Sequence, residues 1–144
     1  MTLEDLRASA PAHRVRRVLV VEDEYFLADD LDRAFRAIGA HVVGPVATVD
    51  DALSALACQH VDVALVDLNL QGEIGFAVLA ALLERRVRVA VATGYGVETL
   101  PERYRDLPYF QKPFDPDDLA RTLTDLDWPD RPPPSRTWHP PGSS

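Results

Sequence analysis

One stretch of the chain, Val61-Asp-Val-Ala-Leu-Val-Asp67, most constrains the fold. Residues 63 to 66 are all apolar, which is typical of a strand buried on both faces of a parallel sheet. The strand ends on Asp67, and open α/β sheets carry their chemistry at the carboxyl ends of parallel strands. Taken alone, Asp67 also fits a simple turn-starting residue. The other strands decide between these two interpretations.

Similar strands recur along the chain, and most are followed by a helical pattern. We predict strands at 18–21, 41–44, 63–66, 87–92 and 107–110. Strand and helix thus alternate about five times, which predicts an α/β fold with a five-stranded, doubly wound parallel sheet and helices on both faces. The segment from Tyr95 to Arg105 contains Pro101 and has little helical periodicity. We therefore expect a short or frayed fourth helix there, few apolar contacts and the highest mobility in the domain.

The length of 144 residues fits one domain, which we place at residues 15–127. Residues 1–14 are interpreted as an N-terminal extension and 128–144 as a flexible Pro-rich tail. No apolar run approaches the roughly 20 residues of a membrane span, and the start lacks a signal-peptide core. The single cysteine, Cys58, excludes an internal disulfide framework and is expected to pack within a helix. These features favour the cytoplasm.

Polar residues gather where the predicted strands end. Glu22 and Asp23 follow the first strand, Asp67 the third, Thr93 the fourth and Lys112 the fifth. Converging carboxylates raise one another's pKa, and a hard divalent cation such as Mg²⁺ relieves that repulsion. The Thr93 hydroxyl and the Lys112 ammonium are donors that a phosphoryl group requires.

Each of these groups also has a simpler interpretation: an acidic helix start, a strand-to-loop turn and a solvated lysine. The last is weakened by composition, because Lys112 is the single lysine among fifteen basic residues. The net charge of −8 argues against a DNA-binding surface, which needs clustered basic side chains.

Together these residues resemble the receiver domain of two-component response regulators, over roughly residues 16 to 126. The residues that carry the resemblance are Glu22, Asp23, Asp67, Thr93, Lys112 and Pro113. The resemblance implies a flavodoxin-like, CheY-like fold with strand order 2-1-3-4-5. It also implies that Asp67 accepts a phosphoryl group from a sensor histidine kinase or a phosphotransfer protein in the bacterial cytoplasm.

The resemblance also implies roles for the other residues. Mg²⁺ (or Mn²⁺) would be held by Glu22, Asp23, Asp67 and the backbone carbonyl of Asn69. Thr93 and Lys112 would contact the phosphoryl group. Thr93 and Tyr109 would form the switch, with the Tyr109 ring rotating inward on phosphorylation. Asn69 and Tyr95 would modulate the reaction, Tyr95 by covering the phosphoryl group. The Lys112–Pro113 peptide bond would be cis.

The end of the fourth predicted strand, Val91-Ala92-Thr93-Gly94-Tyr95-Gly96, is similar to the FAT-GUY subclass of single-domain receivers. Val91 stands where that motif has Phe. Members of the subclass commonly lack a well-formed fourth helix.

We therefore expect a single-domain response regulator that signals by a changed surface or by phosphorelay. It would not be an enzyme beyond catalysing its own phosphorylation and dephosphorylation. It would act on a downstream protein, without DNA or membrane, as a monomer or a phosphorylation-dependent homodimer. One alternative is a pseudo-receiver that binds partners without phosphorylation. Another is an aspartyl-phosphate phosphatase, which would need a second Asp where Asn69 stands.

Overall fold

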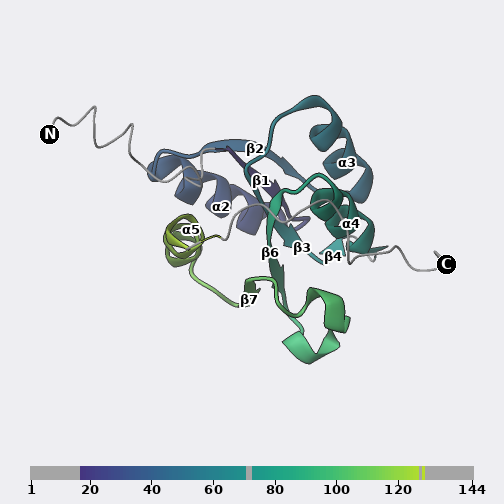
Figure 1. Ribbon diagram of the computed structural model, residues 1–144. Helices are drawn as coiled ribbons and strands as arrows, with labels where there is room; N and C mark the ends of the chain where they lie inside the picture. The colour runs from purple at the N-terminus through teal and green to yellow at the C-terminus, as the bar shows by residue number, and fades with distance from the viewer. Residues whose placement is uncertain (1–16, 71–72, 127, 129–144) are drawn as a thin grey trace, which may run out of the picture.

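A central sheet of five parallel strands organises the molecule, for which a computed structural model describes residues 17–70, 73–126 and 128 (Figure 1). The order across the sheet is β2-β1-β3-β6-β7. This is the predicted order 2-1-3-4-5, which is therefore confirmed. The strands are β1 (Arg17–Val21), β2 (His41–Val46), β3 (Val63–Asp67), β6 (Arg88–Thr93) and β7 (Tyr109–Gln111).

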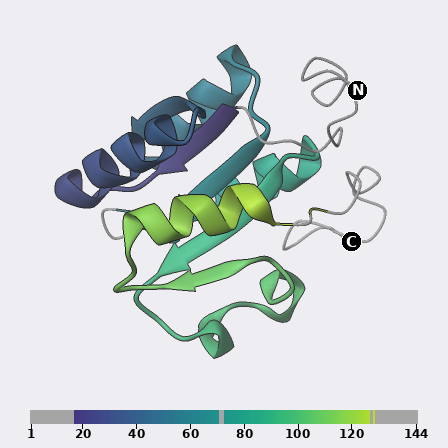
Figure 2. The same cartoon turned by 90° about the vertical axis from the view of Figure 1, so that its left-hand side faces the viewer.

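Among the described residues, four α-helices cover the two faces of the sheet: α2 (Tyr25–Ala37), α3 (Val49–Cys58), α4 (Phe76–Glu84) and α5 (Pro116–Asp125). Because side chains alternate along a strand, Val18 and Val20 of β1 pack on the α2–α5 face, while Leu19 and Val21 pack on the α3–α4 face. Figure 2 looks onto the face that carries α2 and α5. Burial on both faces explains why the strands are almost continuously apolar.

Local signals in the sequence begin and end the helices. The Thr48 hydroxyl accepts a hydrogen bond from the Asp51 N–H at 3.1 Å at the start of α3. At the start of α5, an Asp115 carboxylate oxygen accepts from the Asp117 N–H at 3.0 Å. Gly39 has a φ of +90° just after α2, a conformation that glycine adopts at little cost.

Two short 3₁₀ turns, η1 (Val97–Thr99) and η2 (Glu102–Tyr104), replace a regular helix between β6 and β7. The prediction of a reduced fourth helix is confirmed. The expectation of few apolar contacts is wrong, because Leu100 and Tyr104 are 3% and 1% exposed and belong to the core. In addition, Arg105 donates to the carbonyls of Leu100 and Glu98 at 2.9 and 3.1 Å.

Three further features differ from the sequence-based expectations. Trp128 is buried and its indole N–H donates to the Leu123 carbonyl at 3.2 Å, so the core reaches past the predicted boundary at residue 127. Cys58 is exposed rather than packed. A small antiparallel hairpin joins β4 (Asn69–Leu70) to β5 (Glu73–Ile74) directly after β3.

The predicted extension at 1–14 and the tail from 129 onward lie outside the described residues. In the part of the chain that the structure describes, no helix has the length and apolar character needed to cross a bilayer.

Candidate functional site

The carboxyl ends of the three central strands place Glu22, Asp67 and Thr93 together. In the described ranges these are the buried polar side chains, at 3%, 3% and 2% exposure. The parallel register explains the convergence, since Val21 pairs with Val66 and Asp67 pairs with Ala92. Burial of polar groups is costly, so three such groups at one sheet edge indicate a built site rather than a chance cluster.

The acidic residues at this edge form a group that could hold a metal ion. Oxygen atoms of Glu22, Asp23 and Asp67 all lie within 4.8 Å of one another. The pKa of Glu22 is raised to about 7, first by burial and then by its hydrogen bond to Asp67 and the nearby negative charge. This set of hard oxygen donors fits a divalent cation such as Mg²⁺.

Lys112 is directed into the site and is not a solvated surface lysine. Its Nζ lies 3.1 Å from Asp67 Oδ2, in a hydrogen bond, and 2.9 Å from Glu22 Oε1, in an ion pair without hydrogen-bond geometry. Burial by itself lowers the pKa of Lys112, because it disfavours the charged ammonium. The contacts with the Glu22 and Asp67 carboxylates have the larger combined effect, so the pKa of Lys112 is raised. The backbone N–H of Lys112 donates to the Thr93 carbonyl at 2.9 Å, and the Lys112–Pro113 peptide is cis.

Two backbone N–H groups complete the hydrogen bonds around Asp67 and Thr93. Asp67 Oδ1 accepts from the Asn69 N–H at 3.1 Å. Thr93 Oγ1 accepts from the Tyr95 N–H, also at 3.1 Å. Asn69 and Tyr95 therefore stand at the mouth of the site, one beside each of these two groups.

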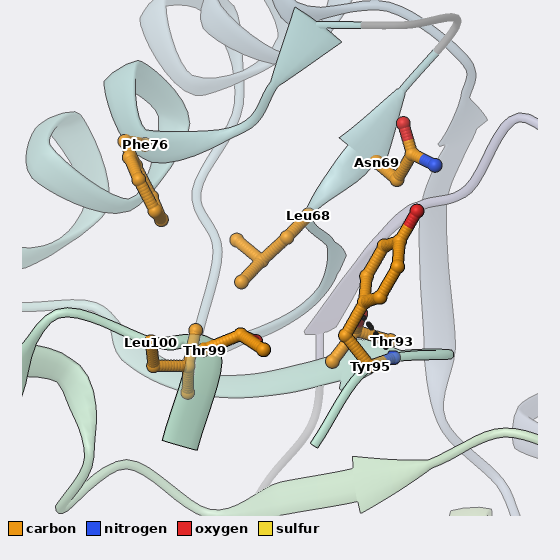
Figure 3. Close-up of a pocket in the computed structure, with 7 residues that line it drawn as sticks. All are labelled: Leu68, Asn69, Phe76, Thr93, Tyr95, Thr99 and Leu100. Carbon is orange, nitrogen blue, oxygen red and sulfur yellow. Dashed lines mark hydrogen bonds between the residues drawn. The ribbon is translucent and has the colours of Figure 1, made fainter. Parts of the chain in front are cut away.

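A cavity of about 340 Å³, here called the lateral cavity, opens beside Thr93 (Figure 3). Its lining residues come from β3–β4, α4, β6 and the turn η1: Leu68, Asn69, Phe76, Thr93, Tyr95, Thr99 and Leu100. Sequence reasoning missed this cavity, because apolar residues such as Leu68, Phe76 and Leu100 are indistinguishable from ordinary core residues until the fold is known.

Tyr109 already packs against the core in this structure. Its ring is half-buried against the α3–α4 side of the core, and its hydroxyl is buried with no hydrogen-bond partner among the described residues. Burial, followed by the charge of Glu98, raises the pKa of Tyr109. The ring is thus partly packed against the core in this structure, and its further inward rotation on phosphorylation stays a prediction.

Comparison with known proteins places this geometry among signalling domains. Residues 18–124 match the response regulator receiver domain family. The transcriptional regulatory protein PdtaR of Mycobacterium tuberculosis is 29% identical over 112 residues, which cover 75% of this chain and 55% of PdtaR. The chain spans about half the length of the curated relatives it matches.

Solved structures give the same result. SdrG from Sphingomonas melonis Fr1 is 35% identical with a TM-score of 0.67, over 76% of this chain and 94% of SdrG. The REC domain of the PhyR response regulator from Erythrobacter litoralis is 28% identical with a TM-score of 0.67, over 79% of this chain and 91% of that domain.

Proposed function

Because the chain belongs to the response regulator receiver domain family, we propose that Asp67 accepts a phosphoryl group from a histidine kinase or a phosphotransfer protein. The observation that carries this proposal is the placement of Asp67. Its carboxylate is 3% exposed, contacts the only lysine of the chain at 3.1 Å and adjoins the carboxylates of Glu22 and Asp23.

In the proposed reaction, a carboxylate oxygen of Asp67 attacks the phosphorus atom of a phosphohistidine. The phosphorus–nitrogen bond breaks, and the histidine leaves with the bonding electrons. The Lys112 ammonium and the Thr93 hydroxyl bind the phosphoryl oxygens and stabilise their negative charge. Lys112 lies in hydrogen-bond contact with Asp67 before the reaction, so it needs little reorganisation.

Receiver domains bind Mg²⁺, and the acidic group of this chain fits that ion. Glu22, Asp23, Asp67 and the backbone carbonyl of Asn69 would hold it. When bound, the ion supplies positive charge that neutralises the carboxylates and the transferring phosphoryl group.

The proposed output is a phosphorylation-dependent protein interaction or a phosphorelay, carried out in the bacterial cytoplasm. Thr93 and Tyr109 form the proposed switch, because Thr93 is beside the acceptor and Tyr109 pairs with the same strand, β6. Asn69 and Tyr95, at the mouth of the site, are proposed to modulate the lifetime of the aspartyl phosphate. The net charge of −8 supports a protein partner rather than DNA.

Labelling with acetyl phosphate and Mg²⁺, followed by intact mass measurement, tests the proposal. The wild-type chain should gain one phosphoryl group, and Asp67→Asn should gain none. Asp50→Asn, which removes an exposed carboxylate on α3, is the matched control and should be labelled like the wild type. Labelling of Asp67→Asn would show that the acceptor is another residue. An unlabelled wild type that also fails with phosphohistidine donors would support a pseudo-receiver.

A further inference from the structure

We propose that the lateral cavity receives the ring of Tyr95 when Asp67 carries a phosphoryl group. The inference rests on the proposed phosphorylation of Asp67. It concerns a movement distinct from that of Tyr109, whose ring is already packed against the core.

The first support is the mismatch between the cavity and the ring beside it. Tyr95 lines the cavity, yet its side chain is 59% exposed to solvent. The cavity is lined by the apolar side chains of Leu68, Phe76 and Leu100 and measures about 340 Å³, which is ample for one phenol ring. Moving an aromatic ring from water into such a space is favourable, so the outer position of the ring calls for an explanation.

The structure shows a contact that fixes the backbone from which the Tyr95 ring projects. The Tyr95 N–H donates to Thr93 Oγ1 at 3.1 Å and ties the backbone to the switch residue. Figure 3 shows the ring standing in front of Thr93, with its hydroxyl directed toward the Asn69 side chain rather than toward Leu68 and Phe76. The outer position therefore depends on where the Thr93 hydroxyl lies.

Phosphorylation would change that position. A phosphoryl group on Asp67 adds charged oxygens, which attract the Thr93 hydroxyl as a strong donor. Once Oγ1 turns toward Asp67, it no longer accepts from the Tyr95 N–H, and the backbone of Tyr95 is released. A side chain added at Gly94 would meet nothing within 4 Å, so the chain before Tyr95 has room to move.

The inner position of the ring would connect the acceptor to two surface elements. There the ring would contact Phe76, the first residue of α4, and Leu100, which follows η1. It would also leave the mouth of the site, between Thr93 and Asn69. Phosphorylation would thus alter the surface at α4 and η1 and expose the phosphoryl group to a partner, in place of the cover by Tyr95 that the family resemblance implies.

Fluorine NMR of the full chain labelled with 3-fluorotyrosine tests this proposal, using Mg²⁺ and beryllofluoride as the phosphoryl analogue. The chain has four tyrosines, and Tyr95→Phe assigns the Tyr95 signal. On loading, the Tyr95 signal should shift and lose most of its H₂O/D₂O isotope shift, because the ring leaves solvent. Bound beryllofluoride gives its own fluorine signals, so occupancy of the site is measured in the same spectrum.

A cavity-filling variant gives the decisive comparison. Phe76→Trp places extra volume in the cavity, whereas Phe26→Trp makes the same change at a side chain that is 78% exposed on α2. Phe76→Trp should bind beryllofluoride but leave Tyr95 exposed, and Phe26→Trp should behave as the wild type. A loaded wild type with Tyr95 still in solvent, or a Tyr95 that is buried equally in Phe76→Trp, would overturn the inference. Absence of bound beryllofluoride would instead overturn the proposed phosphorylation itself.

Discussion

At the scale of single residues, Glu22 shows the cost of building this site. Its carboxyl group is 3% exposed and its pKa is raised to about 7 from 4.5, with burial as the largest cause. A raised pKa means that the folded protein keeps a proton that the unfolded chain has released. The contribution of Glu22 to the free energy of unfolding is therefore fully present below about pH 4.5, and it is lost as the pH rises through about 7.

We predict that Glu22→Gln removes this loss in metal-free protein. The free energy of unfolding of the wild type should fall, by on the order of 3 kcal/mol, between about pH 4.5 and pH 7 relative to the variant. Urea unfolding across this pH range measures the difference. Glu24→Gln, at the exposed neighbouring carboxylate, should follow the wild type. Parallel curves for Glu22→Gln and the wild type would contradict the prediction.

Tyr109 is a second residue that lowers the free energy of unfolding, because its hydroxyl is buried without a hydrogen-bond partner among the described residues. Tyr109→Phe removes that polar atom and keeps the ring, so it should raise the free energy of unfolding by about 1 kcal/mol. Tyr95→Phe, at an exposed ring, should change it by less than about 0.5 kcal/mol. Thermal or denaturant unfolding checks both values. A destabilised Tyr109→Phe would indicate that the hydroxyl is hydrogen-bonded in solution.

At the scale of elements, the sequence predicts the strands and helices because their signals are local. The apolar run before Asp67 and the caps at Thr48 and Asp115 depend on neighbouring residues alone. The site follows from the same information, since the carboxyl ends of parallel strands meet at one sheet edge. Lys112 could be singled out because the chain otherwise uses arginine as its cation.

The remaining features are set by tertiary contacts and could not be predicted in this way. Leu100 and Tyr104 are core residues four positions apart, which is helical spacing, but Pro101 lies between them and argues against a regular helix. Their burial in two short turns therefore could not be predicted from the local pattern. Trp128 lies beyond the last helix and is buried only because it folds back onto Leu123. The lateral cavity depends on how the fold brings Thr99 and Leu100 together with Leu68 and Phe76, which no local pattern encodes.

Arg105 links the two turns of the β6–β7 crossover. Its guanidinium donates to the carbonyls of Glu98 and Leu100, and so closes the loop that contains η1 and η2. Arg105→Ala should lose these two hydrogen bonds, so hydrogen exchange at the Thr99 and Tyr104 amides should be faster. The free energy of global unfolding should fall by only about 1 kcal/mol. Exchange measured by NMR tests this.

The control for Arg105 is Arg121→Ala, which removes an exposed guanidinium paired within α5. It should leave exchange in the crossover unchanged. Equal exchange at Thr99 and Tyr104 in all three proteins would show that Leu100 and Tyr104 alone hold the crossover.

At the scale of the whole molecule, the two edges of the sheet are built for different purposes. At the amino edge, the Arg17 N–H donates to Asp62 at 2.8 Å and its side chain donates to the His60 carbonyl at 2.7 Å. These bonds join β1 to the start of β3. At the carboxyl edge, the equivalent strand ends carry Glu22 and Asp67, with Lys112 as the one cation that contacts both among the described residues. Burial raises the pKa of Glu22, so the charge of this carboxylate opposes folding.

This division predicts that Mg²⁺ stabilises the entire domain rather than its loops alone. An ion that binds only the folded state adds about 2.7 kcal/mol at a concentration of 100 times its Kd, and the melting temperature rises accordingly. Binding needs ionised carboxylates, so the effect should be larger at about pH 8 than at about pH 5, on either side of the raised pKa of Glu22.

Calorimetry with and without Mg²⁺, at matched ionic strength, measures this stabilisation. The ionic strength must be matched because a chain of net charge −8 gains stability from any salt that screens the repulsion among its negative charges. Asp23→Asn removes one oxygen donor of the acidic group and should lose most of the Mg²⁺ effect, whereas Asp50→Asn should retain it. If NaCl at equal ionic strength raised the melting temperature as much as Mg²⁺, the stabilisation would come from screening. The acidic edge would then hold no specific ion, and Lys112 alone would balance its charge.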